Sequence, residues 1–250
     1  MPQLIKTSNP ALNAKIFQGH SVGLEEPMTL DGTVNKTGIL LLCCIATAAY
    51  SWHVFRTTHS VAAVSTLLWV GAIGGFIFAL ITIFQKTWAP VTAPIYSLLE
   101  GLALGGISAI FELRFPGIAI ESVAMTFGVL FVMLIAYRSH VIPVTQKLRL
   151  GIVASTGAIA IFYLVEIILG FFGIHFGAIN GATPIGIGFS IVVVIIASLN
   201  LILDFDFIEG GVENGAPKYM EWYGAFGLMV TLVWLYLEIL RLLSKIRGRD

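Results

Sequence analysis

The chain alternates between long apolar runs and short polar connections. Seven of the runs hold about 20 mostly apolar residues, which is the length that an α-helix needs to cross a membrane. The runs are continuous rather than alternating, which favours helices over a β-barrel. We therefore predict an all-α, polytopic membrane protein with seven transmembrane helices at residues 38–55, 61–84, 91–111, 118–137, 151–173, 184–203 and 222–243.

Polar segments flank this predicted transmembrane domain, which spans 38–246. Residues 1–37 form a polar N-terminal segment without the apolar core of a signal peptide, so we expect the first span to act as the insertion signal. Residues 247–250 form a basic tail. The longest connection, 204–221, is rich in glycine and contains Pro217, so it is predicted to be a loop. No stretch between the spans is long enough for a second folded domain.

The composition narrows the class of protein further. Hydrophobic residues make up 57% of the chain and charged residues only 11%, against about 25% in soluble domains. These values exclude a soluble enzyme and a disordered chain. The net charge is zero, which gives no indication of a nucleic-acid partner. The only two cysteines, Cys43 and Cys44, are adjacent, so neither a disulfide framework nor a zinc site is expected.

The distribution of basic residues predicts how the chain is oriented. With seven spans, the connections alternate between the two sides of the membrane. Excluding the distal N-terminal segment and the C-terminal tail, the side of the N-terminus holds six Lys or Arg residues and the opposite side only Arg56 and Arg114. Because basic residues accumulate on the cytoplasmic side, we expect the N-terminus to be cytoplasmic.

Charged residues within the predicted spans are the first candidates for function. An ionised group at the centre of a bilayer costs about 2.5–3.5 kcal/mol on insertion scales. The spans contain five charged residues: Glu100, Glu121, Glu166, Glu238 and Arg241.

Glu100, Glu166 and Glu238 lie in spans that run in the same direction, so they could line one hydrophilic path. The alternative is that each acid stays protonated and hydrogen-bonds to a neighbouring helix. Glu238 has a further alternative, because Arg241 follows three residues later on the same helix face and could simply pair with it.

Asp204 and Asp206 follow the sixth span directly. Charged residues often mark the border between membrane and water. An acid at this border can also bind a cation, and Asp204 is a candidate Ca²⁺ ligand because oxygen ligands suit Ca²⁺ better than transition metals. Two adjacent carboxylates cannot both ionise cheaply, so a pair of this kind would act as a proton-sensitive latch.

Familiar catalytic and nucleotide-binding motifs are absent from the sequence. There is no HExxH, no Gly-x-Ser-x-Gly and no Walker glycine loop. We therefore expect neither enzymatic activity nor a cofactor. The glycines at 101 and 105 have the spacing of close helix contacts, and we predict that they serve packing.

Three segments carry a resemblance to a known family. MTLDGTVNKT (28–37) precedes the first span, IYSLLEGLALGG (95–106) lies in the third, and LILDFDFIE (201–209) ends the sixth. In their order and spacing, they resemble bacterial members of the Bax inhibitor-1 family.

The resemblance implies a compact seven-helix bundle with the C-terminal helix at its centre. It also implies an integral protein of the bacterial inner membrane that acts as a proton-sensitive calcium leak. In the family, an acid at the end of helix six pairs with an acid in helix seven. Asp204 matches the first position. Glu238 is the only acid within the seventh span, and residues 235–238 resemble the local pattern of the second position.

We therefore predict a pH-sensitive leak channel for Ca²⁺, gated by carboxylates at the membrane border, with Ca²⁺ and H⁺ as its cation partners. In this channel Asp204, Asp206, Glu238 and Arg241 sense protons or ions. The first alternative is a non-conducting protein that modulates other membrane proteins. The second is a proton-coupled transporter that uses Glu100 and Glu166 as relay groups. The expected partners are the lipid bilayer, cations and other membrane proteins.

Overall fold

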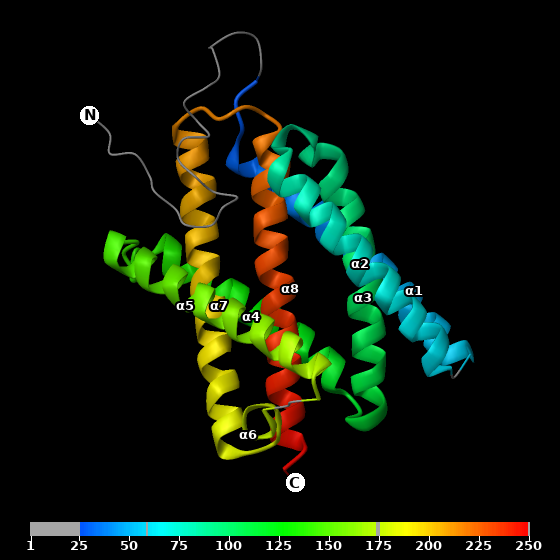
Figure 1. Ribbon diagram of the computed structural model, residues 1–250. Helices are drawn as coiled ribbons and strands as arrows, with labels where there is room; N and C mark the ends of the chain where they lie inside the picture. Colours follow the sequence, from blue (N-terminus) through cyan, green and yellow to red (C-terminus); the bar gives the residue numbers. More distant parts are fainter. Residues whose placement is uncertain (1–25, 59, 174–175, 250) are drawn as a thin grey trace. The chain divides into compact units, whose positions relative to one another are not determined.

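The computed structural model describes residues 26–58, 60–173 and 176–249. Within these residues the chain forms α-helices, one short 3-10 helix and no β-strand (Figure 1). Seven of the helices are long and apolar enough to cross a membrane, which confirms the predicted all-α, polytopic fold. The elements are α1 (Leu30–Thr58), α2 (Val61–Phe84), η2 (Lys86–Trp88), α3 (Ala89–Arg114), α4 (Ile118–Arg138), α5 (Gln146–Phe171), α6 (Gly177–Asn180), α7 (Pro184–Glu213) and α8 (Met220–Arg247).

The first helix begins well before the apolar run that predicted it. Thr29 caps its N-terminus, since the Gly32 amide donates to the Thr29 hydroxyl oxygen at 3.0 Å. The hydroxyl groups of Thr33 and Thr37 each donate to the carbonyl oxygen four residues earlier, at 2.9 Å in both cases. The polar side chains of the first turns are therefore satisfied within the helix, which allows it to extend beyond the apolar segment.

The predicted loop at 204–221 is wrong over its first half, because α7 continues to residue 213. Glycine within a helix costs only about 1 kcal/mol, so the paired glycines of this segment do not end it. The helix ends instead at Glu213, just before Gly215, which has a φ of 64°. The amide of Ala216 donates to the carbonyl oxygen of Gly211 at 3.0 Å, as in a Schellman motif. Asp204 and Asp206 are therefore helical residues, not loop residues.

The described residues form two compact units, and α7 and α8 contribute to both. Unit 1 contains residues 26–116 and 204–230, so it holds α1, α2, α3, the last part of α7 and the first part of α8. Unit 2 contains residues 117–203 and 231–249, so it holds α4, α5, α6 and the remaining parts of α7 and α8.

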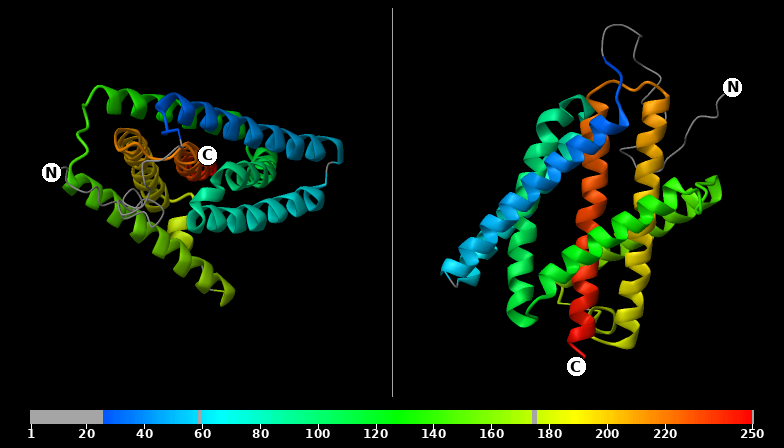
Figure 2. Two further views of the ribbon diagram at one scale, coloured as in Figure 1. Left: turned by 90° about the horizontal axis from the view of Figure 1, so that it is seen from above. Right: turned by 180° about the vertical axis from the view of Figure 1, so that it is seen from behind.

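Within unit 1, α3 packs against both α1 and α2 (Figures 1 and 2). Gly101 and Gly105 of α3 face α1 so closely that a Cβ atom at either position would overlap the backbone of Cys44 or Ala48. Gly71 of α2 faces the backbone of α3 in the same way. The prediction that the glycines at 101 and 105 serve helix packing is confirmed.

Unit 1 also has a hydrophobic cluster that joins the end of α7 to the start of α8. The rings of Tyr96 and Phe226 pack edge to face with their centroids 5.0 Å apart. The buried members of the cluster are Met28, Ala89, Phe207, Ile208, Ala216, Met220 and Tyr223.

In unit 2, aromatic side chains of α5 and α7 pack together. The ring of Phe162 lies 5.1 Å from that of Phe189 and 5.9 Å from that of Phe176.

Of the seven long helices, α8 has the largest buried share, at 61% of its most apolar stretch. A central place for α8 in the bundle, which the family resemblance implies, stays a prediction, as do the membrane boundaries of the individual spans. The polar N-terminal segment falls outside the described residues up to position 25.

Candidate functional site

Glu238 is a buried carboxylate in the part of α8 that belongs to unit 2, and only 2% of it is exposed. Its Oε1 atom accepts a hydrogen bond of 2.9 Å from the hydroxyl group of Tyr163 on α5. Nη1 of Arg241 lies 3.4 Å from the same oxygen. The Arg241 guanidinium also lies over the Tyr163 ring, 4.9 Å from its centroid. The pairing of Arg241 with Glu238 that the spacing suggested is present.

The second carboxylate oxygen of Glu238 is in a different situation. Oε2 is buried and accepts no hydrogen bond from the described residues. Burying a polar atom without a partner costs about 1–3 kcal/mol, and more for a charged group. An oxygen in this state can be stabilised by a proton or by a cation, so Glu238 is equipped to bind either one.

Glu166 lies one turn after Tyr163 on α5 and is half-buried. The side-chain amide of Asn180, the last residue of α6, donates a hydrogen bond to Glu166 Oε1. Glu166 is therefore bonded to a neighbouring helix, as the alternative interpretation of the buried acids predicted. Whether it also lines a path stays a prediction.

Polar side chains gather where α5 and α8 face each other in unit 2. Positions 238, 241 and 245 follow one face of α8, and positions 163 and 166 follow one face of α5. We call this set the α5–α8 polar face, and its members are Tyr163, Glu166, Glu238, Arg241 and Lys245. Three of the five carry a hydrogen bond or an ion pair to another member. The face gives unit 2 a continuous series of charges inside an apolar set of helices.

Glu100 lies in unit 1, apart from this polar face. It is half-buried on α3, and a Cβ atom at Gly75 of α2 would come within 2.8 Å of its Oε2 atom. It has neither a hydrogen bond nor an ion pair with the described residues. Of the three acids that were predicted to share one path, Glu100 belongs to unit 1 and the other two to unit 2, and a common path stays a prediction.

Asp204 and Asp206 also belong to unit 1. Asp204 is buried, with 6% of it exposed, and Asp206 is half-buried. Residues two apart on an α-helix do not face each other, so the helical backbone does not favour a direct pairing of these two carboxylates. Among the residues that the structure describes, no group of three or more His, Cys, Asp or Glu side chains could hold a metal ion. A Ca²⁺-binding role for Asp204 stays a prediction.

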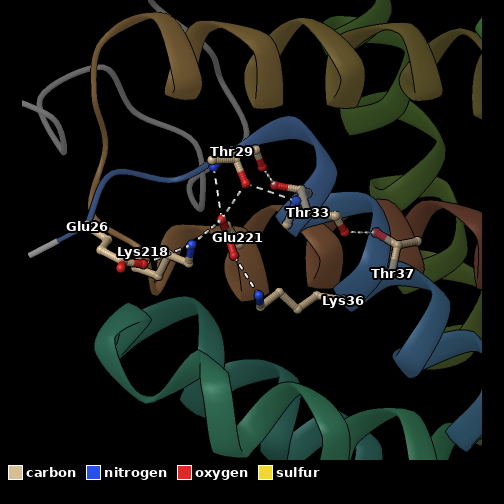
Figure 3. Close-up of polar contacts among 8 residues, drawn as sticks. Glu26, Thr29, Thr33, Lys36, Thr37, Lys218 and Glu221 are labelled. Carbon is tan, nitrogen blue, oxygen red and sulfur yellow. Dashed lines mark hydrogen bonds and ion pairs between the residues drawn. The ribbon is translucent and has the colours of Figure 1, made fainter.

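A second buried glutamate, Glu221, lies at the start of α8 in unit 1 and was missed by sequence reasoning. Its side chain is fully buried, and Lys36 Nζ lies 2.6 Å from Oε2 (Figure 3). Oε1 accepts hydrogen bonds of 2.9 Å from both the amide and the hydroxyl group of Thr29. Lys218 Nζ is 3.5 Å from the same oxygen. The four residues Thr29, Lys36, Lys218 and Glu221 form what we call the Glu221 cluster.

The Glu221 cluster explains why the segment before the first span has its particular sequence. A Cβ atom at Gly32 would overlap the Glu221 carboxylate, so a larger residue would have to displace that carboxylate from its partners. The Met28 amide donates to the Ala216 carbonyl oxygen at 2.7 Å, which fixes the entry segment beside the start of α8. At the rim, the hydrogen bond with Glu26 raises the pKa of Lys218 above its usual value.

Comparison with known families assigns the chain to a family. A family model described as Bax inhibitor 1 like matches residues 9–248, which is nearly the whole chain. The chain belongs to the Bax inhibitor 1 like family. Comparisons with curated proteins and with solved structures gave no significant match.

For this Bax inhibitor 1 like protein, the resemblance read from three short segments is therefore confirmed. Sequence reasoning identified Glu238, Arg241 and Glu166 but not the groups that bind them. Their partners Tyr163 and Asn180 carry no local signal, since an apolar span contains many tyrosines and asparagines at its ends. Sequence reasoning gave no role to Lys245, which the structure buries.

Proposed function

We propose that this protein is a pH-sensitive cation leak that lets Ca²⁺ pass passively down its gradient. The observation that carries the proposal is the buried carboxylate of Glu238, which has one oxygen bonded by Tyr163 and the other without a hydrogen-bond donor among the described residues. A carboxylate kept in this state within apolar helices favours a proton or a cation as its ligand. Membership of the Bax inhibitor 1 like family supports the same function.

The Arg241 side chain suggests how the leak is limited. Its guanidinium is 41% exposed and lies 3.4 Å from Glu238 Oε1, where it competes with an incoming cation for the carboxylate. Because this ion pair is half exposed, it is worth little, and a cation can displace it at low cost. Protonation of Glu238 removes the negative charge that attracts both the Arg241 guanidinium and the incoming cation.

Asp204 is the second carboxylate in the proposed response to pH. It is buried, with 6% of it exposed, and the family resemblance supports a pH-sensing role for it. A proton that binds more tightly in one conformation than in another shifts the equilibrium toward the first. We propose that protonation of Asp204 and of Glu238 shifts the protein between closed and open states.

We further propose that the protein lies in a bacterial inner membrane with its N-terminus in the cytoplasm. The starts of α1 and α8 meet in unit 1 through Thr29 and Glu221, as expected when seven helices alternate in direction. Basic and aromatic side chains gather there, since Lys36 Nζ lies 5.8 Å from the centroid of the Trp222 ring. Aromatic residues are typical of both membrane interfaces, and the basic residues among them favour the cytoplasmic one.

Purified protein in liposomes with an enclosed calcium dye tests the leak. We expect Ca²⁺ influx that changes between pH 6 and pH 8 in the wild type and not in Asp204→Asn. Glu213→Gln, which removes an exposed acid at the end of α7, is the matched control and should keep the wild-type pH profile. An Asp204→Asn profile identical to that of the wild type removes Asp204 from the mechanism, and the absence of any flux removes the leak.

A proton-coupled transporter is the second candidate, and Glu100 is the observation that favours it. A half-buried carboxylate without an ion pair can take up and release a proton during transport. Proton uptake that depends on an added substrate, and that is lost in Glu100→Gln, would support this alternative. A copurifying membrane protein without ion flux would instead support the non-conducting modulator.

A further inference from the structure

Lys245 is a buried cation near the C-terminal end of α8 in unit 2. Only 5% of it is exposed, although it lies two residues before the end of the helix. Lysine is almost never fully buried unless it is paired, because its ammonium group is strongly hydrated in water. The burial of Lys245 therefore needs an explanation.

The ammonium group of Lys245 is held entirely by neutral oxygens. Its Nζ donates to the carbonyl oxygen of Ile179 at 2.7 Å, to the carbonyl oxygen of Gly186 at 3.2 Å and to the hydroxyl oxygen of Ser190 at 2.9 Å. An ammonium group has three N–H donors, so all of them are used. Among the described residues, no carboxylate forms an ion pair with Lys245.

This oxygen set, which we call the oxygen cage, resembles the environment that hard metal cations prefer. Ca²⁺ and similar ions bind backbone carbonyl and side-chain oxygens. The cage supplies such oxygens from α6 and from the first turns of α7, and the tethered ammonium fills it. Within the cage the positive charge has no ion-pair partner among the described residues, which is costly for stability alone.

The cage lies at the end of the α5–α8 polar face. Lys245 follows Arg241 by four residues and Glu238 by seven, so it is displaced from Glu238 by about 10 Å along the helix axis. In unit 2, a cation that approaches Glu238 from the C-terminal end of α8 thus meets the Lys245 charge before that of Arg241.

We infer that Lys245 is a tethered cation that occupies the oxygen cage, fastens α6 and the start of α7 to α8, and so keeps this end of unit 2 closed to permeating cations. The inference rests on the proposed leak, whose regulation it specifies. Removal of the Lys245 charge frees the oxygens of the cage and loosens α6 and the start of α7, which carry them. The leak then increases.

The test compares Lys245→Met with Lys147→Met, which removes an exposed lysine from the first turn of α5 in the same unit. We expect Ca²⁺ flux into liposomes at pH 7 to rise about tenfold in Lys245→Met, because coupling free energies between two sites are typically of this size. Lys147→Met should behave as the wild type. Ser190→Ala, which removes a single acceptor and disturbs folding least, should give a smaller rise.

Hydrogen exchange of the peptide covering 177–190 gives a readout that does not depend on flux. Its amides should exchange faster in Lys245→Met and Ser190→Ala than in the wild type, because the connection has lost its anchor. If the wild type conducts but both variants show wild-type flux or wild-type exchange, the inference is overturned and the leak stands. If the wild type itself does not conduct, the proposed leak fails. In that case, unchanged hydrogen exchange in the variants also overturns the inference that Lys245 fastens α6 and the start of α7 to α8.

Discussion

Helix α8 carries two buried glutamates, one in each unit, and their surroundings differ. Glu221 in unit 1 is bonded on both carboxylate oxygens, by two donors of Thr29 and by two lysines. Glu238 in unit 2 has one oxygen shared by Tyr163 and Arg241 and one that no described residue bonds. The two side chains are almost equally buried, at 0% and 2% exposed.

The comparison shows that burial of an acid does not by itself indicate function. The number and charge of the groups that bond each carboxylate separate the two residues instead. Two ammonium groups and a helix N-terminus fix the charge of Glu221, which makes it a structural anchor for the entry segment. A single half-exposed guanidinium and one hydroxyl group leave Glu238 able to exchange its ligands. We therefore propose that the first serves stability and the second the response to pH.

Replacing each glutamate by alanine should separate the two roles most strongly. Glu221→Ala leaves Lys36 beside an empty, buried space and is expected to cost about 3–5 kcal/mol, as for a broken buried ion pair. Glu238→Ala leaves the Tyr163 hydroxyl group without its acceptor and the 41% exposed Arg241 without its ion pair, and it should cost about 1–2 kcal/mol. Thermal unfolding in detergent measures both. Equal losses of stability would break the comparison.

Gly32→Ala tests whether the Glu221 cluster depends on close approach. The added methyl group overlaps the carboxylate, so we expect a loss of about 1–3 kcal/mol in the free energy of unfolding. Gly38→Ala on the same helix is the control, because a Cβ atom at this position has nothing within 4 Å. The control should be neutral or slightly stabilising, since alanine is the better helix former. A neutral Gly32→Ala would show that the cluster can shift freely.

Tyr163→Phe should have the smallest effect on stability and a specific effect on flux. The variant loses one hydrogen bond and is expected to cost about 1 kcal/mol or less. Because the hydroxyl group donates to the carboxylate on which the proposed pH response depends, its loss should move the midpoint of the pH profile of Ca²⁺ flux. Phe162→Leu, an apolar change one residue earlier, should leave the midpoint in place. An unmoved midpoint in Tyr163→Phe contradicts a role for Glu238 in the pH response.

The helices and the local pairs could be predicted from the sequence because they depend on neighbouring residues. Apolar runs indicated the seven long helices, and a spacing of three residues indicated the pair Glu238–Arg241. The end of α7 could not be located, because its paired glycines are typical of a turn but lie in a buried helix. The capping glycine at 215 carries the actual signal, and it looks the same as its neighbours in the sequence.

Glu221 could not be found because its partners are remote. Thr29 lies 192 residues away along the chain, and Glu221 itself lies one residue outside the predicted span 222–243, where an acid at an interface is ordinary. The entry segment 28–37 did carry a family signal. Its physical meaning, a glycine and a threonine that receive a buried carboxylate, depends on tertiary structure alone.

The most direct test of the central claim is Ca²⁺ flux into liposomes between pH 6 and pH 8 for Glu238→Gln and Glu221→Gln, each normalised to folded protein. Both variants remove a buried negative charge from α8 while keeping the shape of the side chain. We predict that Glu238→Gln conducts without pH dependence and that Glu221→Gln, although less stable, keeps the wild-type pH profile. A pH-dependent flux in Glu238→Gln, or its loss only in Glu221→Gln, contradicts the assignment.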